Sequence, residues 1–197
     1  MLNNFSNWII EVLSKSGLIT REEKDVYFFG VETALLKLIH FSTMLIVGAY
    51  VGMLLETFIF IISYSALRVY AGGYHAKTRL RCYGISWIMI LFVLLSAKFC
   101  PNQIVFSASI MIFLPSYIIV FLLAPVDNIN KPLDDLEIHY YRIKTRIILS
   151  VELIISMILL FMHLIQIVLI VSLSIFLVAI MLLAGKAQKQ VIHDLSV

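Results

Sequence analysis

The sequence predicts an all-α fold, a polytopic membrane helical bundle with about six transmembrane helices and an N-terminal amphipathic helix. Of its 197 residues, 61% are hydrophobic and 14% are charged, and the mean hydropathy is +1.00. Soluble domains have about 45–50% apolar and about 25% charged residues. Because a crossing needs about 20 apolar residues, six crossings leave no room for a separate soluble domain. We therefore expect a single membrane-embedded domain over residues 1–197.

The first 27 residues are expected to provide an amphipathic helix at the membrane interface. Apolar residues recur at helical spacing over residues 4–14, namely Phe5, Trp8, Ile9, Val12 and Leu13. Gly17 would end this helix, and the run from Thr20 to Glu23 has the form of a capping box that opens the next one. The pattern fits an anchoring helix and equally a docking surface for an amphipathic substrate.

Six apolar segments follow, at about residues 30–53, 54–69, 83–99, 104–123, 147–164 and 166–184. Pro115 lies inside the fourth segment and is expected to kink it. Charged groups at membrane depth normally face the bundle interior. This applies to Glu32, Lys37 and His40 in the first segment and to Glu152 in the fifth, although Lys37 could equally snorkel to the interface.

The distribution of Lys and Arg predicts the orientation of the chain. With six spans and an internal N-terminus, all of the 15 cations except Lys37 and Lys98 fall in internal segments. The positive-inside rule therefore places both termini and the loop after the second span in the cytoplasm. These cations are few and spread over several loops, so the lipid bilayer is the expected partner and nucleic acid is not.

The loop between the second and third spans carries a histidine and a cysteine, His75 and Cys82. A thiol close to an imidazole suggests an activated thiolate nucleophile. A straight helix would separate the two by about 10 Å along its axis, whereas a nucleophile and its base need about 3 Å. The adjacent Gly72 and Gly73 supply a backbone that can bend before His75.

Two features of this loop favour the ionised thiol. Cys82 would fall near the start of the next helix, where free N–H groups and the helix dipole stabilise a negative charge. The cations Lys77, Arg79 and Arg81 act in the same direction. The alternative is an inert cysteine in an ordinary basic membrane loop.

Cys100 and His163 are not expected to take part in catalysis. Cys100 should lie at the opposite membrane face, so no disulfide with Cys82 is expected. His163 should lie at the outer turn between the last two spans and be dispensable for chemistry. Ligand spacings typical of metal sites do not occur, and we expect neither a metal nor another cofactor.

The run Arg68-x-x-x-Gly72-Gly73-x-His75-Ala76, followed by Cys82, resembles the signature of the accessory gene regulator B (AgrB) family. These are bacterial membrane cysteine endopeptidases that process the precursor of a quorum-sensing peptide. The resemblance implies catalytic roles for His75 and Cys82, supporting roles for Arg68, Gly72 and Gly73, and the bacterial cell membrane as location. A second element, with Ala124-Pro125-Val126 and Lys131-Pro132, is similar to the Ala-Pro…Lys-Pro element of that family.

The resemblance also implies a substrate and a mechanism. An AgrD-like precursor peptide would lose its C-terminal tail through an acyl-thioester on Cys82, and the retained part would then cyclise to a thiolactone or lactone. The group that orients His75 is open, with Ser86 and Asp127 as candidates, and a homodimer is also left open. The alternative from another class is a small non-enzymatic membrane transporter or peptide-export subunit, with a pathway along Glu32, Lys37, His40 and Glu152.

Overall fold

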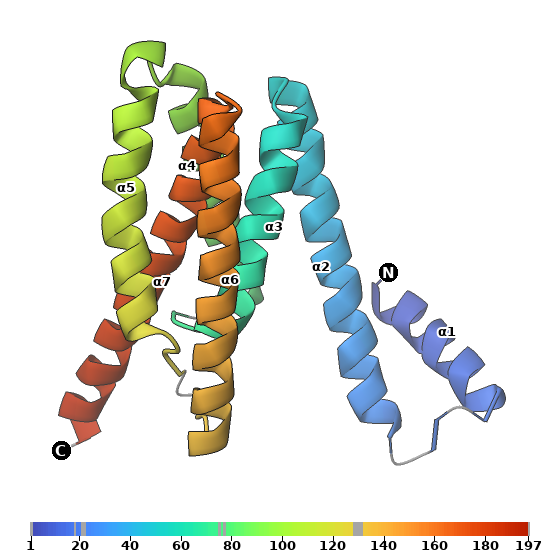
Figure 1. Ribbon diagram of the computed structural model, residues 1–197. Coiled ribbons are helices and arrows are strands. Elements are labelled where there is room, and N and C mark those ends of the chain that lie inside the picture. The colour runs from blue at the N-terminus through green and yellow to red at the C-terminus, as the bar shows by residue number, and fades with distance from the viewer. Residues whose placement is uncertain are drawn as a thin grey trace. The chain divides into compact units, whose positions relative to one another are not determined.

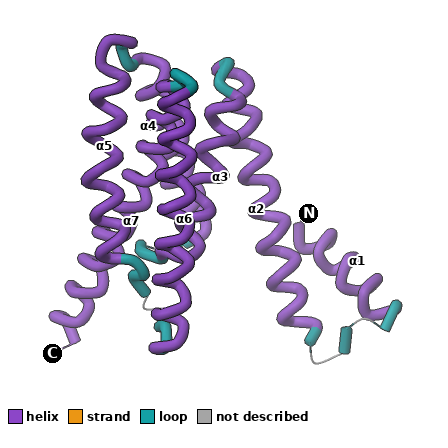
Figure 2. Tube along the Cα trace, in the orientation of Figure 1, coloured by secondary structure: helices purple, strands orange, loops and turns teal. Residues whose placement is uncertain are grey.

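The computed structural model describes residues 2–17, 19–20, 23–74, 76, 78–127 and 132–196. Within these ranges the chain forms seven helices and no strand (Figures 1 and 2). The chain divides into two compact units, residues 1–47 and residues 48–197. The predicted all-α class is therefore confirmed.

The first unit consists of α1 (Leu2–Lys15) and most of α2 (Lys24–Val51). Gly17 ends α1 as predicted, because its φ of 73° lies in the left-handed region. The Glu23 carboxylate accepts hydrogen bonds from the Thr20 backbone N–H at 3.0 Å and from the Thr20 hydroxyl at 2.8 Å. These bonds hold the pKa of Glu23 below its usual range. The bond from the Thr20 N–H to the Glu23 carboxylate is one of the two reciprocal hydrogen bonds of the predicted capping box.

The second unit is a bundle of the remaining helices, which are α3 (Leu54–Ala71), α4 (Arg79–Phe99), α5 (Asn102–Leu123), α6 (Asp135–Phe161) and α7 (Ile165–Ser196). The central element is α7, which packs against the other four. Its segment 168–175 is buried all round and almost wholly apolar. A helix that is apolar on every face belongs inside a bundle.

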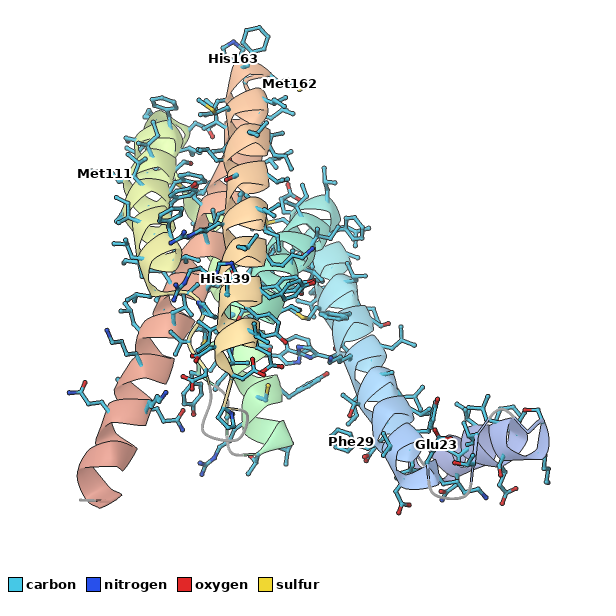
Figure 3. All side chains as sticks on the ribbon, turned by 60° about the horizontal axis from the view of Figure 1, so that its bottom comes forward. Glu23, Phe29, Met111, His139, Met162 and His163 are labelled. Carbon is cyan, nitrogen blue, oxygen red and sulfur yellow. The ribbon has the colours of Figure 1, made fainter. Side chains whose placement is uncertain are left out.

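The outer helices face away from this centre with apolar side chains. Met111 of α5 is 77% exposed, and Figure 3 shows it pointing outward. Apolar residues also lie exposed along α3, α4 and α6, including Phe58, Ile88 and Ile154. Such a surface suits contact with lipid.

Each of the six segments expected to span the membrane overlaps one of the helices α2 to α7. Five of these helices, α2, α3, α4, α5 and α7, are long and apolar enough to cross a membrane. The remaining helix, α6, has no charged residue beyond Glu152. Up to that point, after its second turn, it carries four charged residues, namely Arg142, Lys144, Arg146 and Glu152. The chain is thus an all-α, multi-pass membrane bundle.

The main differences from the predicted spans lie at helix ends. The segment expected to be a polar loop before residue 147 is helical from Asp135 onward. Its start is a capping box, in which the Glu137 N–H donates to Asp134 at 2.6 Å and the Asp134 N–H donates to Glu137 at 3.4 Å. The spacing of these two acids is the sequence signal for that start. Pro115, expected to kink its segment, lies inside the continuous helix α5.

The connections within the second unit alternate between the two ends of the bundle (Figure 1). Short turns at 52–53, 100–101 and 162–164 lie at one end. We call this the turn end. Figure 3 shows His163 at the tip of α6, as its predicted place in a turn requires. The first described parts of the other two connections, residues 72–74 and 124–127, lie at the opposite end, which we call the loop end. The predicted cytoplasmic location of the loop end remains a prediction.

Candidate active site

Gly72 and Gly73 turn the chain sharply at the end of α3. Their φ angles are 71° and 103°, which residues with a side chain rarely adopt. A Cβ on Gly72 would lie 2.2 Å from the carbonyl oxygen of Val126, and one on Gly73 would lie 2.6 Å from that of Met181. The predicted bend is confirmed, and the close approach of two other segments explains why both positions must be glycine.

Backbone hydrogen bonds join this glycine pair to two distant segments. The Gly73 N–H donates to the Val126 carbonyl at 2.8 Å, and the Val126 N–H donates to the Ala71 carbonyl at 2.9 Å. The Tyr74 N–H donates to the Met181 carbonyl of α7 at 2.8 Å. The two motif elements recognised separately in the sequence, Gly-Gly and Ala-Pro-Val, are therefore paired with each other and with α7.

Arg68 stabilises the loop from the last turns of α3. The guanidinium group donates to the Gly72 carbonyl through Nη1 and to the Tyr74 carbonyl through Nη2. Arg68 thus fixes the backbone of the glycine turn directly.

Cys82 lies in the first turns of α4, as predicted. Thr78 is the N-cap of this helix, and its hydroxyl accepts a hydrogen bond from the Arg81 N–H at 3.3 Å. The Cys82 N–H donates to the Thr78 carbonyl at 3.1 Å, and its thiol is free and exposed. An exposed thiol close to a helix N-terminus has the surroundings of a reactive cysteine.

The comparison with known families assigns the chain. The family model described as "AgrB: Accessory gene regulator B" matches residues 6–182, which is most of the sequence. The chain belongs to the AgrB family. The resemblance recognised in the Gly-Gly-x-His motif is therefore confirmed.

Two curated relatives support this assignment. An AgrB-like protein 2 of Clostridium perfringens (strain 13 / Type A) is 33% identical over 138 residues, and an AgrB-like protein of strain SM101 / Type A is 32% identical over 138 residues. Each match covers 68% of this chain and 64% of the relative. No solved structure matches this chain significantly.

His75, the other member of the predicted catalytic pair, lies outside the described residues, as does Lys77. The two candidates for orienting His75 have other partners, because the Ser86 hydroxyl donates to the Cys82 carbonyl at 3.1 Å and Asp127 forms an ion pair with Lys189. The pairing of His75 with Cys82 therefore stays a prediction for this AgrB-family chain.

Cys100 occupies the other end of α4 from Cys82. It is the residue at the C-cap of that helix, at the turn end of the bundle, and its thiol is also free. Among the residues that the structure describes, no three His, Cys, Asp or Glu side chains form a group that could hold a metal ion.

The sequence did not identify the contribution of α7 to the site. The predicted last span ended at residue 184, whereas α7 continues to Ser196. A Cβ on Gly185 would lie 2.6 Å from the Tyr74 nitrogen and 2.7 Å from the Gly73 carbonyl carbon. One turn further, Lys189 contacts both Asp127 carboxylate oxygens at 2.8 and 2.9 Å. The available signal was the glycine that directly follows the apolar run predicted as the last span.

Aromatic and cationic side chains surround the same end of the bundle. Tyr70 packs edge-on against Tyr140 and Tyr141 of α6, with ring centroids 6.5 and 5.9 Å away. The Arg146 guanidinium lies 4.4 Å from the centre of the Phe121 ring. The loop end of this AgrB-family bundle thus combines an exposed thiol, a tightly held glycine loop and a cationic, aromatic surrounding.

Proposed function

We propose that this AgrB-family chain is a membrane cysteine endopeptidase that removes the C-terminal tail of an AgrD-like precursor peptide. The observation that carries the proposal is the exposed Cys82 thiol in the first turns of α4. The neighbouring turn supports it, since Arg68 and backbone hydrogen bonds fix residues 72–74 against two other segments. Nucleophilic catalysis requires this kind of fixed surrounding around an accessible thiol.

In the first step the Cys82 thiolate attacks the carbonyl carbon of the scissile peptide bond. His75 accepts the thiol proton and then donates a proton to the leaving amine. The peptide bond breaks, a thioester forms between Cys82 and the retained part of the peptide, and the tail leaves with a new amino terminus.

In the second step a side chain of the retained peptide attacks the thioester. If that side chain is a cysteine thiol, the product is a cyclic thiolactone, and if it is a hydroxyl, the product is a lactone. The Cys82 thiol is regenerated in either case. Exchange of one thioester for another changes the free energy little, and conversion of a peptide bond to a thioester is unfavourable, so removal of the released tail must drive the sequence.

The proposed site lies at the cytoplasmic surface of the bacterial cell membrane. The positive-inside distribution of Lys and Arg supports this location for the loop end. Thiols stay reduced in the cytosol, which a cysteine nucleophile requires. The cationic side chains around α6 suit a peptide with an acidic tail.

Processing of a synthetic precursor peptide by the purified protein tests this function. Cys82→Ala and His75→Ala should each abolish cleavage without changing membrane insertion. The matched control is Cys100→Ala, which changes the other free thiol at the turn end and should be nearly silent. Full cleavage by Cys82→Ala protein would contradict the proposal.

A transporter or peptide-export subunit is the second candidate. The observation that favours it is Glu152, a carboxyl group buried within the apolar bundle. A detergent-solubilised protein separates the two functions, because it has no compartments to transport between. Precursor cleavage in detergent supports the endopeptidase, and its complete absence with a folded protein supports the transporter.

A further inference from the structure

Glu152 lies on the buried face of α6, among groups that carry no formal positive charge. The residue is 6% exposed and shares that face with Thr145, Leu149 and Ser156. The Ser63 hydroxyl of α3 donates to its Oε1 atom at 2.7 Å. Its Oε2 atom is buried and has no hydrogen-bond partner among the described residues. One oxygen of this carboxyl group is therefore bound as an acceptor, and the other is not.

The cations nearest along the packed helices have other partners. Arg68 of α3 donates to the loop carbonyls, and Arg146 of α6 lies over the Phe121 ring. On the helices that pack against α6, the other titratable groups are Glu56, Tyr64 and Tyr70 of α3 and Tyr117 of α5, and the membrane half of α7 has none. A carboxylate here would be an uncompensated buried charge, which costs several kcal/mol.

Ser156 carries a second buried polar group on the same face of α6 that is unpaired within the described part of the chain. It lies one turn beyond Glu152 on the same face, is buried, and its hydroxyl has no partner among the described residues. Other buried serines of the bundle donate to the carbonyl four residues earlier, as Ser109 and Ser172 do. The Ser156 hydroxyl makes no such bond to the Glu152 carbonyl and none to Glu152 Oε2, so the face of α6 holds two buried oxygens, one turn apart, that are unpaired among the residues that the structure describes.

We infer that Glu152 is a proton-binding site inside the bundle, with the proton on Oε2. In this neutral acid Oε1 is the carbonyl oxygen that accepts from Ser63, and Oε2, which accepts no hydrogen bond from the described residues, carries the O–H. The ligand of the site is a proton, which removes the charge that the apolar surroundings cannot stabilise. This inference is independent of the proposed peptidase activity.

Infrared spectroscopy of the full-length protein in lipid at neutral pH tests the site. A protonated carboxyl group gives a C=O stretching band separate from that of a carboxylate, and the exposed acids are ionised under these conditions. We expect one such band in the unchanged protein and its loss in Glu152→Gln. Absence of the band, or its persistence in Glu152→Gln, overturns the proposal.

A second variant keeps the test valid if Glu152→Gln does not fold. Ser63→Ala removes the donor to Oε1, so the C=O band should remain and shift to higher frequency. An unshifted band overturns the assignment to Glu152.

Addition of Na⁺ to the unchanged protein provides a third test. Loss of the acid band on adding Na⁺ would identify a site for a metal cation and contradict the proton assignment.

Discussion

The two ends of the bundle each use a glycine at positive φ, for different purposes. Gly52 at the turn end and Gly73 at the loop end have φ angles of 76° and 103°. Nothing lies within 4 Å of a Cβ added to Gly52, whereas one added to Gly73 meets the backbone of α7. Glycine is therefore required at the turn end only for the direction of the chain, and at the loop end also for contact between segments. The loop end is the part of the bundle in which backbone position is specified from several sides.

Replacement of each glycine by alanine should separate these two requirements, and it should produce the largest effect. Both changes place a side chain at positive φ, at a cost of about 1–2 kcal/mol. Only Gly73→Ala adds a clash with Met181, worth about 1–3 kcal/mol more. Gly73→Ala should abolish precursor cleavage, and Gly52→Ala should retain it. Equal cleavage by the two variants would remove the distinction between the ends.

Two glycines inside helices, Gly185 of α7 and Gly84 of α4, allow a second comparison between a glycine in close contact and one in open space. Gly185→Ala places a methyl group 2.6 Å from the Tyr74 nitrogen, so it should destabilise the protein by about 1–3 kcal/mol and reduce cleavage. The matched control is Gly84→Ala in α4, where the added Cβ meets nothing within 4 Å. This change should stabilise the helix by about 0.5–1 kcal/mol. Thermal unfolding in detergent measures both, and a Gly185→Ala protein as stable as the control would contradict the role assigned to α7.

Arg68→Lys tests whether the planar guanidinium holds the loop. Arg68 donates to two carbonyl groups at once, and a lysine ammonium cannot reproduce that fork. Loss of one charge-assisted hydrogen bond costs about 1.5–3 kcal/mol, which corresponds to a reduction of cleavage by at least about tenfold. The control Arg142→Lys changes an exposed arginine of α6 and should be silent. A fully active Arg68→Lys protein would show that charge alone is sufficient.

The smallest effect is expected for the ion pair between Asp127 and Lys189. Lys189 is 57% exposed and Asp127 24%, so the pair should contribute about 0–1 kcal/mol. Lys189→Ala and Asp127→Ala should each lower stability slightly, and the charge swap Asp127→Lys with Lys189→Asp should recover part of the loss. A double-mutant cycle measures this coupling. A coupling well above that range would mean that the pair, as well as the glycine contacts, fixes the loop on α7.

The helices were predictable because their signals are local. About 20 consecutive apolar residues specify a crossing wherever they occur, so each predicted span overlaps one of the helices α2 to α7. Gly17 and the Cys82 position at the start of α4 were predictable for the same reason. The start of α6 was missed although its signal is also local, because the charges between residues 134 and 146 favoured a loop interpretation over the Asp134–Glu137 capping box.

The arrangement of the site depends on contacts between distant segments, which spacing along one chain does not contain. Gly73 meets Val126 and Met181 because the ends of α3 and α5 lie against the middle of α7. No pattern within residues 70–82 indicates that Val126 and Met181 contact Gly73. The contact of Gly185 with Tyr74 likewise appears only in the packed bundle. The role of Arg68 likewise follows from the loop carbonyls that it reaches.

The central claim, that Cys82 is the nucleophile, is tested most directly by the mass of the protein during turnover. A precursor whose internal cysteine is replaced by alanine cannot close a thiolactone, so the acyl-thioester should accumulate. After acid quenching we predict a protein heavier by the mass of the retained peptide, with the modification on Cys82 and removed by neutral hydroxylamine. Release of the tail without any adduct, or an adduct of the same mass on Cys82→Ala protein, would contradict the account.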